Sequence, residues 1–279
     1  MKESGRNLTM QAQTLNEMLV SFQKEFLQIA VKEDAVTFNI PEEKALRQGR
    51  EKDIPLINIC PPLVKAEDFF ATMKQVAEII KSFMPELAEE TEQIEAALPV
   101  APAAQKKFTA MAFTPGADLL SYLKTDLPPE TFGFLLNHTV KPFMRQYARS
   151  LSNYLDPETW LEGCCPVCGG KPTLALLEKQ DGRRYLYCGL CEVKWRFHRL
   201  GCPYCVDFES HFFTVEGMEK YRVYYCEKCH GYIKTIDERK TDVDVKELFW
   251  EDINTVQLDI LAMREGYFNQ QAVPQEPEK

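Results

Sequence analysis

Eight of the ten cysteines in this 279-residue chain form four pairs, each with two residues between its cysteines. The pairs are Cys165/Cys168, Cys188/Cys191, Cys202/Cys205 and Cys226/Cys229. Two intervening residues allow both sulfurs of one turn to reach the same metal ion, and two such turns complete a tetrahedral site. The four pairs therefore predict two metal sites with four thiolate ligands each.

The spacing between the pairs indicates how they combine. Nineteen residues separate Cys168 from Cys188, and twenty separate Cys205 from Cys226. Both gaps match the spacing of metal ribbons, which is about 15–20 residues. The simplest assignment is sequential, with the first two pairs forming site 1 and the last two forming site 2. A cross-braced arrangement, which joins the first pair to the third and the second to the fourth, is the alternative.

Four thiolates suit two kinds of metal site, a zinc ribbon and the mononuclear iron of a rubredoxin-like site, because ligand softness does not separate these metals. A site with four protein ligands has no open position for water or substrate. The chain also has no phosphate-binding glycine loop and no nucleophile motif. We therefore predict two metal ions with a structural or electron-transferring role, and no enzyme activity.

Other candidate ligands are weaker. Cys164 directly precedes a predicted ligand and is interpreted as a spare thiol, and Cys60 ends an apolar run that predicts a buried core cysteine. His198, His211 and His230 lie near the sites in sequence, but eight cysteines already complete two ligand sets. Neighbouring or surface roles are therefore expected for the three histidines.

The distribution of cysteines also predicts the domain organisation. Nine of the ten lie between Cys164 and Cys229, which places a domain border near residue 160. We expect a helical domain over residues 1–160, a first metal module over 161–200, and a second module with a C-terminal helix over 201–268. Residues 269–279 are expected to be a disordered tail.

Apolar residues at three- and four-residue spacing predict amphipathic helices in the N-terminal part. Three such stripes recur there: Leu15, Met18, Leu19, Phe22, Phe26, Ile29; Phe69, Met73, Val76, Ile80, Phe83; and Phe132, Leu135, Leu136, Val140, Phe143, Tyr147, Tyr154. Pro85 should end or kink the second helix and Pro142 should kink the third. The proline-containing stretch 96–104 is predicted to be a loop, and a last helix is expected over about residues 245–264.

Short runs of alternating aromatic and charged residues near the cysteine pairs predict strands. They are residues 184–187, 193–197, 222–225 and 232–235. The predicted class is therefore α+β, with an irregular helical domain followed by two small hairpin-built metal modules and a C-terminal helix.

Charge and hydropathy limit the classes of function. The net charge of −9 disfavours a protein that works by binding phosphate backbones. The hairpin over residues 183–199 nevertheless has a local charge of +4, which indicates either a solvated face or a docking patch for an acidic partner. Charged residues interrupt the first forty residues, so we expect neither a targeting nor a membrane segment, and a cytoplasmic protein.

Five segments of the metal-binding part carry a resemblance to a known family. They are Cys165-Pro166-Val167-Cys168-Gly169, Arg184-Tyr185-Leu186-Tyr187-Cys188-x-x-Cys191-Glu192 with Trp195, Cys202-x-x-Cys205, Cys226 to Thr235, and Leu258 to Tyr267. Together with the order and spacing of all four cysteine pairs, these segments resemble the formate dehydrogenase accessory protein FdhE, over about residues 160–268. The N-terminal part is only loosely similar, in the Pro55-Leu56 run and the helix over residues 132–151.

The resemblance implies a helical domain followed by two rubredoxin-like modules that hold iron rather than zinc. It also implies a maturation factor that binds the catalytic subunit of formate dehydrogenase in the cytoplasm before that subunit is exported. Two other classes remain open, a rubredoxin-like electron carrier and a zinc-ribbon adaptor that binds nucleic acid.

Overall fold

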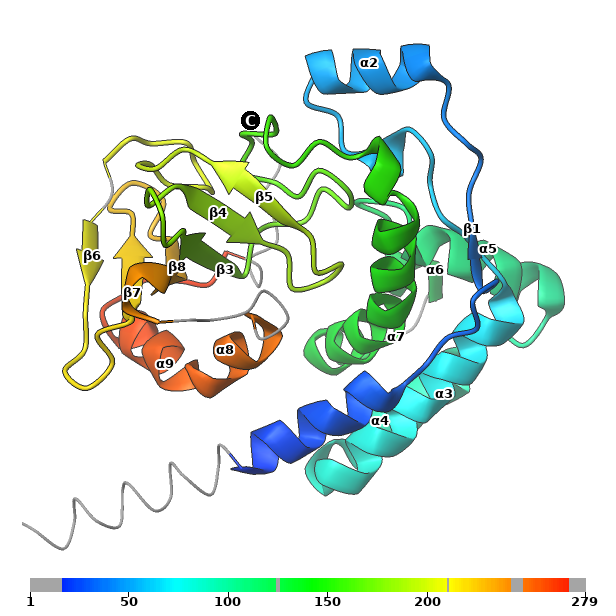
Figure 1. Cartoon of the computed structure of the whole chain (residues 1–279). Helices are drawn as coiled ribbons and strands as arrows, with labels where there is room; N and C mark the ends of the chain where they lie inside the picture. The colour runs from blue at the N-terminus through cyan, green and yellow to red at the C-terminus, as the bar shows by residue number, and fades with distance from the viewer. Residues whose placement is uncertain (1–16, 124–125, 210, 242–247, 271–279) are drawn as a thin grey trace, which may run out of the picture. The chain divides into compact units, whose positions relative to one another are not determined.

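The computed structural model describes residues 17–123, 126–209, 211–241 and 248–270 (Figure 1). The chain folds into two compact units. Unit 1 contains the described residues up to Pro41 and Cys60–Ser150, and unit 2 contains Glu42–Ile59 and the described residues from Leu151 onwards. Residues 42–59 thus group with the cysteine-rich part. The domain borders expected near residues 160, 200 and 268 remain predictions.

Unit 1 is built from helices and one short two-stranded sheet. Its elements are a helix over residues 17–28, β1 (Val36–Thr37), β2 (Leu63–Val64), α3 (Ala66–Phe83), η2 (Pro85–Leu87), α4 (Ala88–Ala97), α5 (Pro102–Ala112), α6 (Leu119–Leu123) and α7 (Pro129–Ser150). Its core forms where α3 packs against α7, and Phe69 and Phe143 are fully buried with their ring centroids 6.2 Å apart.

The helical predictions for unit 1 are largely confirmed. Helix α3 carries the stripe from Phe69 to Phe83 and ends directly before Met84 and Pro85, because proline cannot continue the hydrogen-bond ladder. Pro142 lies inside α7, which ends at Ser150, so Tyr154 of the third predicted stripe lies beyond this helix. The predicted loop over residues 96–104 is shorter than expected, since α4 continues to Ala97 and α5 begins at Pro102, a residue favoured in the first turn of a helix.

Unit 2 combines a six-stranded sheet with short helices. Its elements are α2 (Glu43–Glu51), η1 (Leu56–Asn58), η3 (Ser152–Tyr154), β3 (Leu174–Leu177), β4 (Arg184–Tyr187), β5 (Lys194–Phe197), β6 (His211–Phe213), β7 (Tyr221–Tyr225), β8 (Tyr232–Asp237), η4 (Glu238–Lys240), α8 (Leu248–Asn254) and α9 (Val256–Arg264). All four predicted strands are present as β4, β5, β7 and β8. Strands β3 and β6 were not predicted.

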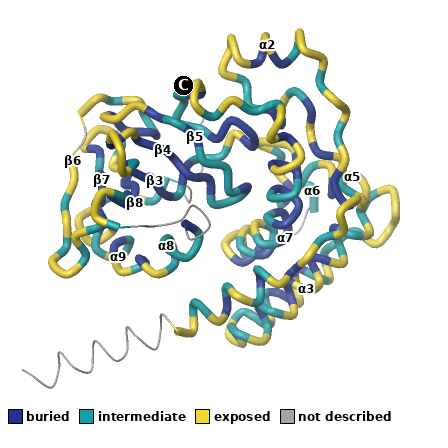
Figure 2. Tube along the Cα trace, in the orientation of Figure 1, coloured by how far each residue is buried: buried dark blue, intermediate teal, exposed yellow. Residues whose placement is uncertain are grey.

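The two cysteine-rich modules share one continuous sheet. The strand order is β5-β4-β3-β8-β7-β6, and every neighbouring pair is antiparallel except β3 and β8, which are parallel. Each module therefore contributes three strands, and the β3–β8 pair joins them. Strands β3, β4 and β8 are buried at every position (Figure 2).

Helices α8 and α9 cover one face of this sheet (Figure 1). Leu248 on α8 and Leu258 and Ala262 on α9 pack against Leu176 and Ile236 of the sheet. The single helix expected over about residues 245–264 is thus two helices, with a break at Thr255, whose hydroxyl donates to the Glu251 carbonyl. Residues 245–247, Leu15 and residues 271–279 of the expected tail lie outside the described residues. The predicted α+β class, with two cysteine-rich β modules in the C-terminal part, is confirmed.

Candidate metal centres

Each cysteine pair lies in a turn with the same backbone hydrogen bond. The N–H of the first cysteine donates to the carbonyl five residues later. These bonds are Cys165 to Gly170 (2.8 Å), Cys188 to Val193 (3.0 Å), Cys202 to Asp207 (2.7 Å) and Cys226 to Gly231 (3.0 Å). The four turns are therefore versions of one metal knuckle, even though their sequences differ after the second cysteine.

The residue after the second cysteine has a left-handed backbone in all four turns. The φ angles are 72° at Gly169, 63° at Glu192, 58° at Val206 and 53° at His230. A left-handed conformation is unstrained for glycine but unfavourable for other residues, most of all for β-branched ones. Three turns thus hold a non-glycine residue in this conformation, which indicates that the turn geometry outweighs local preference at these positions.

The eight paired cysteines gather into two groups of four. One contains Cys165, Cys168, Cys188 and Cys191, the other contains Cys202, Cys205, Cys226 and Cys229, and all sulfurs within a group lie within 4.8 Å of one another. The first two pairs therefore group together and so do the last two, as the sequential assignment predicted. The cross-braced alternative is wrong. Elsewhere in the described part of the chain, no three His, Cys, Asp or Glu side chains come together in this way.

The spacing of the sulfurs fits a tetrahedral ion. Metal–sulfur bonds of about 2.3 Å imply sulfur–sulfur distances of about 3.8 Å. In the first group, Cys165 lies 3.4 Å from Cys191 and Cys168 lies 3.4 Å from Cys188, measured between Sγ atoms. In the second group, both Cys202–Cys229 and Cys205–Cys226 measure 3.6 Å. A slight expansion of each group therefore accommodates one ion of the size of zinc or iron.

The local chemistry also calls for a cation. Burial raises the pKa of the Cys165 thiol and raises that of Cys202 to about 11, whereas hydrogen bonds from its three neighbouring cysteines lower the pKa of Cys188. The four sulfurs of a group therefore do not all ionise readily by themselves. A bound metal ion would supply the positive charge that four clustered thiolates need. Backbone N–H groups add a smaller contribution, because Gly170 donates to Cys168 Sγ and Tyr204 donates to Cys202 Sγ, both at 3.4 Å.

The two groups differ in their exposure. All four cysteines of the first group are buried, whereas Cys205 and Cys229 of the second are partly exposed. The four knuckles are numbered in chain order, so the first is the turn over residues 165–170 and the third is the turn over residues 202–207. Residues 54–59 cover the first knuckle, since the N–H of Leu56 donates to the Pro166 carbonyl and that of Ile57 to the Val167 carbonyl. Among the described residues, no segment covers the third knuckle through backbone hydrogen bonds of this kind.

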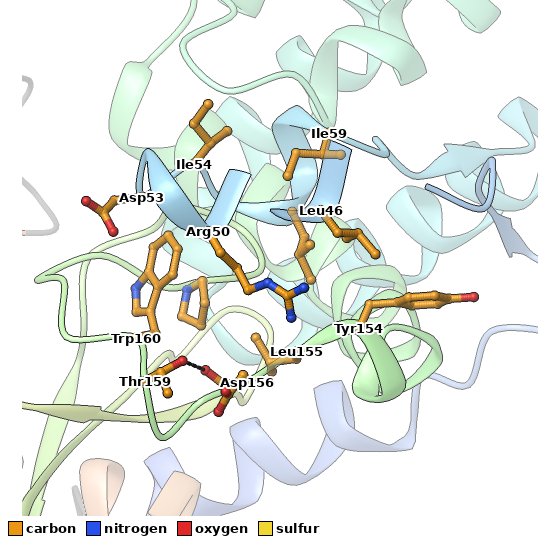
Figure 3. Close-up of a pocket in the computed structure, with 12 residues that line it drawn as sticks. Leu46, Arg50, Asp53, Ile54, Ile59, Tyr154, Leu155, Asp156, Thr159 and Trp160 are labelled. Carbon is orange, nitrogen blue, oxygen red and sulfur yellow. Dashed lines mark hydrogen bonds between the residues drawn. The ribbon is translucent and has the colours of Figure 1, made fainter. Parts of the chain in front are cut away.

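A pocket lies beside the first knuckle, with Pro166 in its lining (Figure 3). Its wall is mostly apolar and includes Leu46, Ile59 and Trp160, and the Arg50 side chain points into it. Arg50 also lies 3.4 Å from Glu43, and the Trp160 indole donates to the Cys164 carbonyl. The pocket therefore helps to join residues 42–59 to the first metal module, and its lining contains no catalytic constellation.

The remaining candidates lie outside both cysteine groups. The Cys164 thiol belongs to neither, and Cys60 is buried in unit 1, where its carbonyl accepts a hydrogen bond from the Tyr147 hydroxyl. His198 and His211 are exposed, and His230 contributes its left-handed backbone and a carbonyl that accepts from Phe268. The left-handed turn positions at Glu192, Val206 and His230 were not predicted from the sequence, because the usual signal for such a turn is a glycine after the second cysteine.

Three comparisons relate the chain to known proteins. A family model described as the FdhE central domain matches residues 164–199, which contain all four cysteines of the first group. The chain is 31% identical over 153 residues to the "Protein FdhE homolog" of Aquifex aeolicus (strain VF5), covering 53% of each sequence. It is also 31% identical over 108 residues to "Protein FdhE" of Escherichia coli (strain K12 / DH10B), covering 37% of this chain and 34% of that protein.

A solved structure has a similar fold. The crystal structure of the FdhE protein from Pseudomonas aeruginosa matches with a TM-score of 0.56 and 19% identity, over 92% of this chain and 86% of that one. All three comparisons support the FdhE family. In sequence, this chain spans about half the length or less of the curated relatives it matches. The predicted resemblance to FdhE is thereby confirmed. None of the described helices is long and apolar enough to cross a membrane.

Proposed function

We propose that this chain is an accessory factor for formate dehydrogenase, which binds the immature catalytic subunit in the cytoplasm before export and performs no catalysis itself. The observation that carries the proposal is the pair of closed four-cysteine groups within a chain of the FdhE family. Closed thiolate sites hold a surface rigid but leave no coordination position for substrate.

The proposed ligands are the eight paired cysteines, which hold two metal ions. Site 1 uses Cys165, Cys168, Cys188 and Cys191, and site 2 uses Cys202, Cys205, Cys226 and Cys229. The proposed metal is iron, on the strength of the family resemblance, with zinc as the alternative that the same thiolates accept. Metal analysis of anaerobically purified protein distinguishes the two, since iron in such a site absorbs visible light and zinc does not.

The partner is tested by anaerobic affinity purification from the native host, with co-purifying proteins identified by mass spectrometry. Recovery of a formate dehydrogenase catalytic subunit supports the proposal. Two adjacent cysteines provide a matched pair of variants, because Cys165 belongs to the first group and Cys164 does not. Cys165→Ser should lose the partner and formate dehydrogenase activity in cells, and Cys164→Ser should retain both. Survival of both in Cys165→Ser would show that this metal site does not matter to the function.

Partial exposure of Cys205 and Cys229 favours a second candidate, an electron carrier. Electron transfer requires an iron site near the surface that cycles reversibly between two oxidation states. Protein that binds only zinc would exclude this role. The nucleic-acid adaptor gains less support, because Arg184 of the basic hairpin is buried and the predicted basic face is interrupted there.

A further inference from the structure

Arg184 is buried, although its place in a charged hairpin predicted a solvated face or a docking patch. The residue begins β4, which lies between β3 and β5, and it is only 1% exposed. Its guanidinium lies over the rings of Tyr224 and Phe197, with centroid distances of 5.1 and 5.7 Å. A buried arginine usually requires a partner of opposite charge, because removing a charge from water is unfavourable.

No carboxylate among the described residues pairs with Arg184. Its Nη1 atom donates to the Gly201 carbonyl at 2.7 Å, and its Nε atom has no hydrogen-bond partner. Other buried charges of unit 2 are paired, since Lys234 contacts Asp252 and Asp259, and Asp237 contacts two arginines. Arg184 therefore differs from them and needs another source of negative charge.

The second cysteine group lies beside Arg184 and is such a source. Gly201, which accepts the hydrogen bond from Arg184, directly precedes Cys202. Arg184, Cys202 and Cys226 also line one small cavity, whose volume of about 10 Å³ has room for no more than one water. An anionic small molecule does not fit there. Four thiolates around a divalent ion carry a net charge of about −2, and one buried guanidinium offsets half of it.

We propose that Arg184 is a positioning residue and the buried counter-charge of the second metal centre. It holds the third knuckle through Gly201 and stabilises the thiolate charge of the site. Strand β4 also runs directly into Cys188, a proposed ligand of site 1. One strand therefore supplies a ligand to the first centre and a counter-charge to the second, which couples the two modules. This inference rests on the proposed metal occupancy of the second group.

The test compares the full chain with Arg184→Gln, which removes the charge but keeps a hydrogen-bond donor, and Arg184→Lys, which keeps the charge. Arg183→Met is the matched control, because Arg183 is the adjacent residue, is exposed and pairs with Asp181. Each protein is challenged with a metal chelator and a thiol-alkylating reagent, and peptide mass spectrometry identifies which cysteines become labelled. Each is also loaded anaerobically with iron, and the midpoint potentials are measured.

In Arg184→Gln, we expect the site 2 cysteines to lose metal about 10- to 100-fold faster, with site 1 unchanged. The midpoint potential of the second centre should fall, because the reduced iron site carries one more negative charge than the oxidised site. Arg184→Lys should restore the potential towards that of the wild type, an effect that a merely structural role does not produce. Arg183→Met should behave as the wild type.

Wild-type release rates and potentials in Arg184→Gln would overturn the inference and leave the metal sites themselves intact. Equal losses of potential in the Gln and Lys variants would also overturn it, since charge would then not be the cause. A wild-type chain that holds no metal in the second group would contradict the proposed function together with this inference.

Discussion

The Nζ atom of Lys234 on β8 lies 2.8 Å from the Oδ2 atom of Asp259 on α9, with the Lys234 side chain only 3% exposed. Asp252 completes the contact at 2.7 Å, and the Tyr232 hydroxyl donates to the other Asp259 oxygen. These contacts connect helices α8 and α9 to strand β8 of the sheet. Lys234 and Asp259 both lie in segments that resemble FdhE, and the structure gives them a role in stability.

Removal of Lys234 should destabilise unit 2 strongly. Lys234→Met leaves two adjacent carboxylates without their cation, at an expected cost of about 3 kcal/mol in the free energy of unfolding. Burial already raises the pKa of Asp259, and Lys234 opposes that rise. Chemical denaturation measures the effect, and Arg47→Met, at the exposed Arg47–Glu51 pair, is the control that should show no measurable change. Equal stability of Lys234→Met and wild type would refute this role.

Much of the metal-binding part follows from local sequence. The nearly equal gaps between Cys168 and Cys188 and between Cys205 and Cys226 pointed to the sequential grouping, and aromatic runs beside the cysteines predicted β4, β5, β7 and β8. These signals are local, since each concerns one hairpin.

The features that sequence did not reveal depend on residues far apart in the chain. The parallel β3–β8 pair joins residues about sixty positions apart, such as Leu174 and Lys234, and no local pattern marks it. Residues 54–59 cover the first knuckle from more than a hundred positions away. Arg184 looked like part of a solvated strand face because charge alternates there, but β4 is an inner strand of the sheet.

The left-handed residue after each second cysteine predicts a stabilising substitution. Val206 is 56% exposed and holds a φ of 58°, which costs a β-branched residue about 1–2 kcal/mol. Val206→Asn should therefore raise the free energy of unfolding by about 1 kcal/mol, because asparagine tolerates this conformation better. Val100→Asn is the matched control, as Val100 is exposed and has no positive φ. An equal change in both variants would show that side-chain polarity, not backbone strain, is responsible.

The difference in burial between the cysteine groups predicts an order of metal loss. Cys205 and Cys229 are partly exposed, whereas Cys165 and its three partners are buried. With limiting chelator and an alkylating reagent, the second group should be labelled before the first, because reagents reach exposed sulfurs more readily. Peptide mass spectrometry at successive times follows the order. Labelling of Cys165 first would contradict the prediction and would indicate that residues 54–59 open readily.

His138 on α7 should make unit 1 sensitive to acid. Its ring stacks on that of Phe26, with the ring centroids 3.9 Å apart, and its Nδ1 atom has no hydrogen-bond partner. Burial, together with the nearby Lys141 charge, lowers the pKa of His138 to about 3. The folded state thus favours the neutral ring, while the unfolded chain takes up a proton near pH 6.5. The contribution of the neutral His138 ring to the stability of unit 1 is fully present above pH 6.5. It should be lost as the pH falls towards 3, by at most about 1.4 kcal/mol per pH unit.

The substitution His138→Phe tests this origin, because it keeps an aromatic ring between Phe26 and Phe134 but cannot take up a proton. We expect unfolding curves of the variant to depend less on pH between 6.5 and 4 than those of the wild type. Phe113→Leu, in the same unit, should lower stability by a similar amount at every pH, since it removes buried packing against Phe143 and no titrating group. If wild type and His138→Phe lost stability in parallel as the pH fell, the acid sensitivity would have to arise from carboxylates elsewhere in the unit.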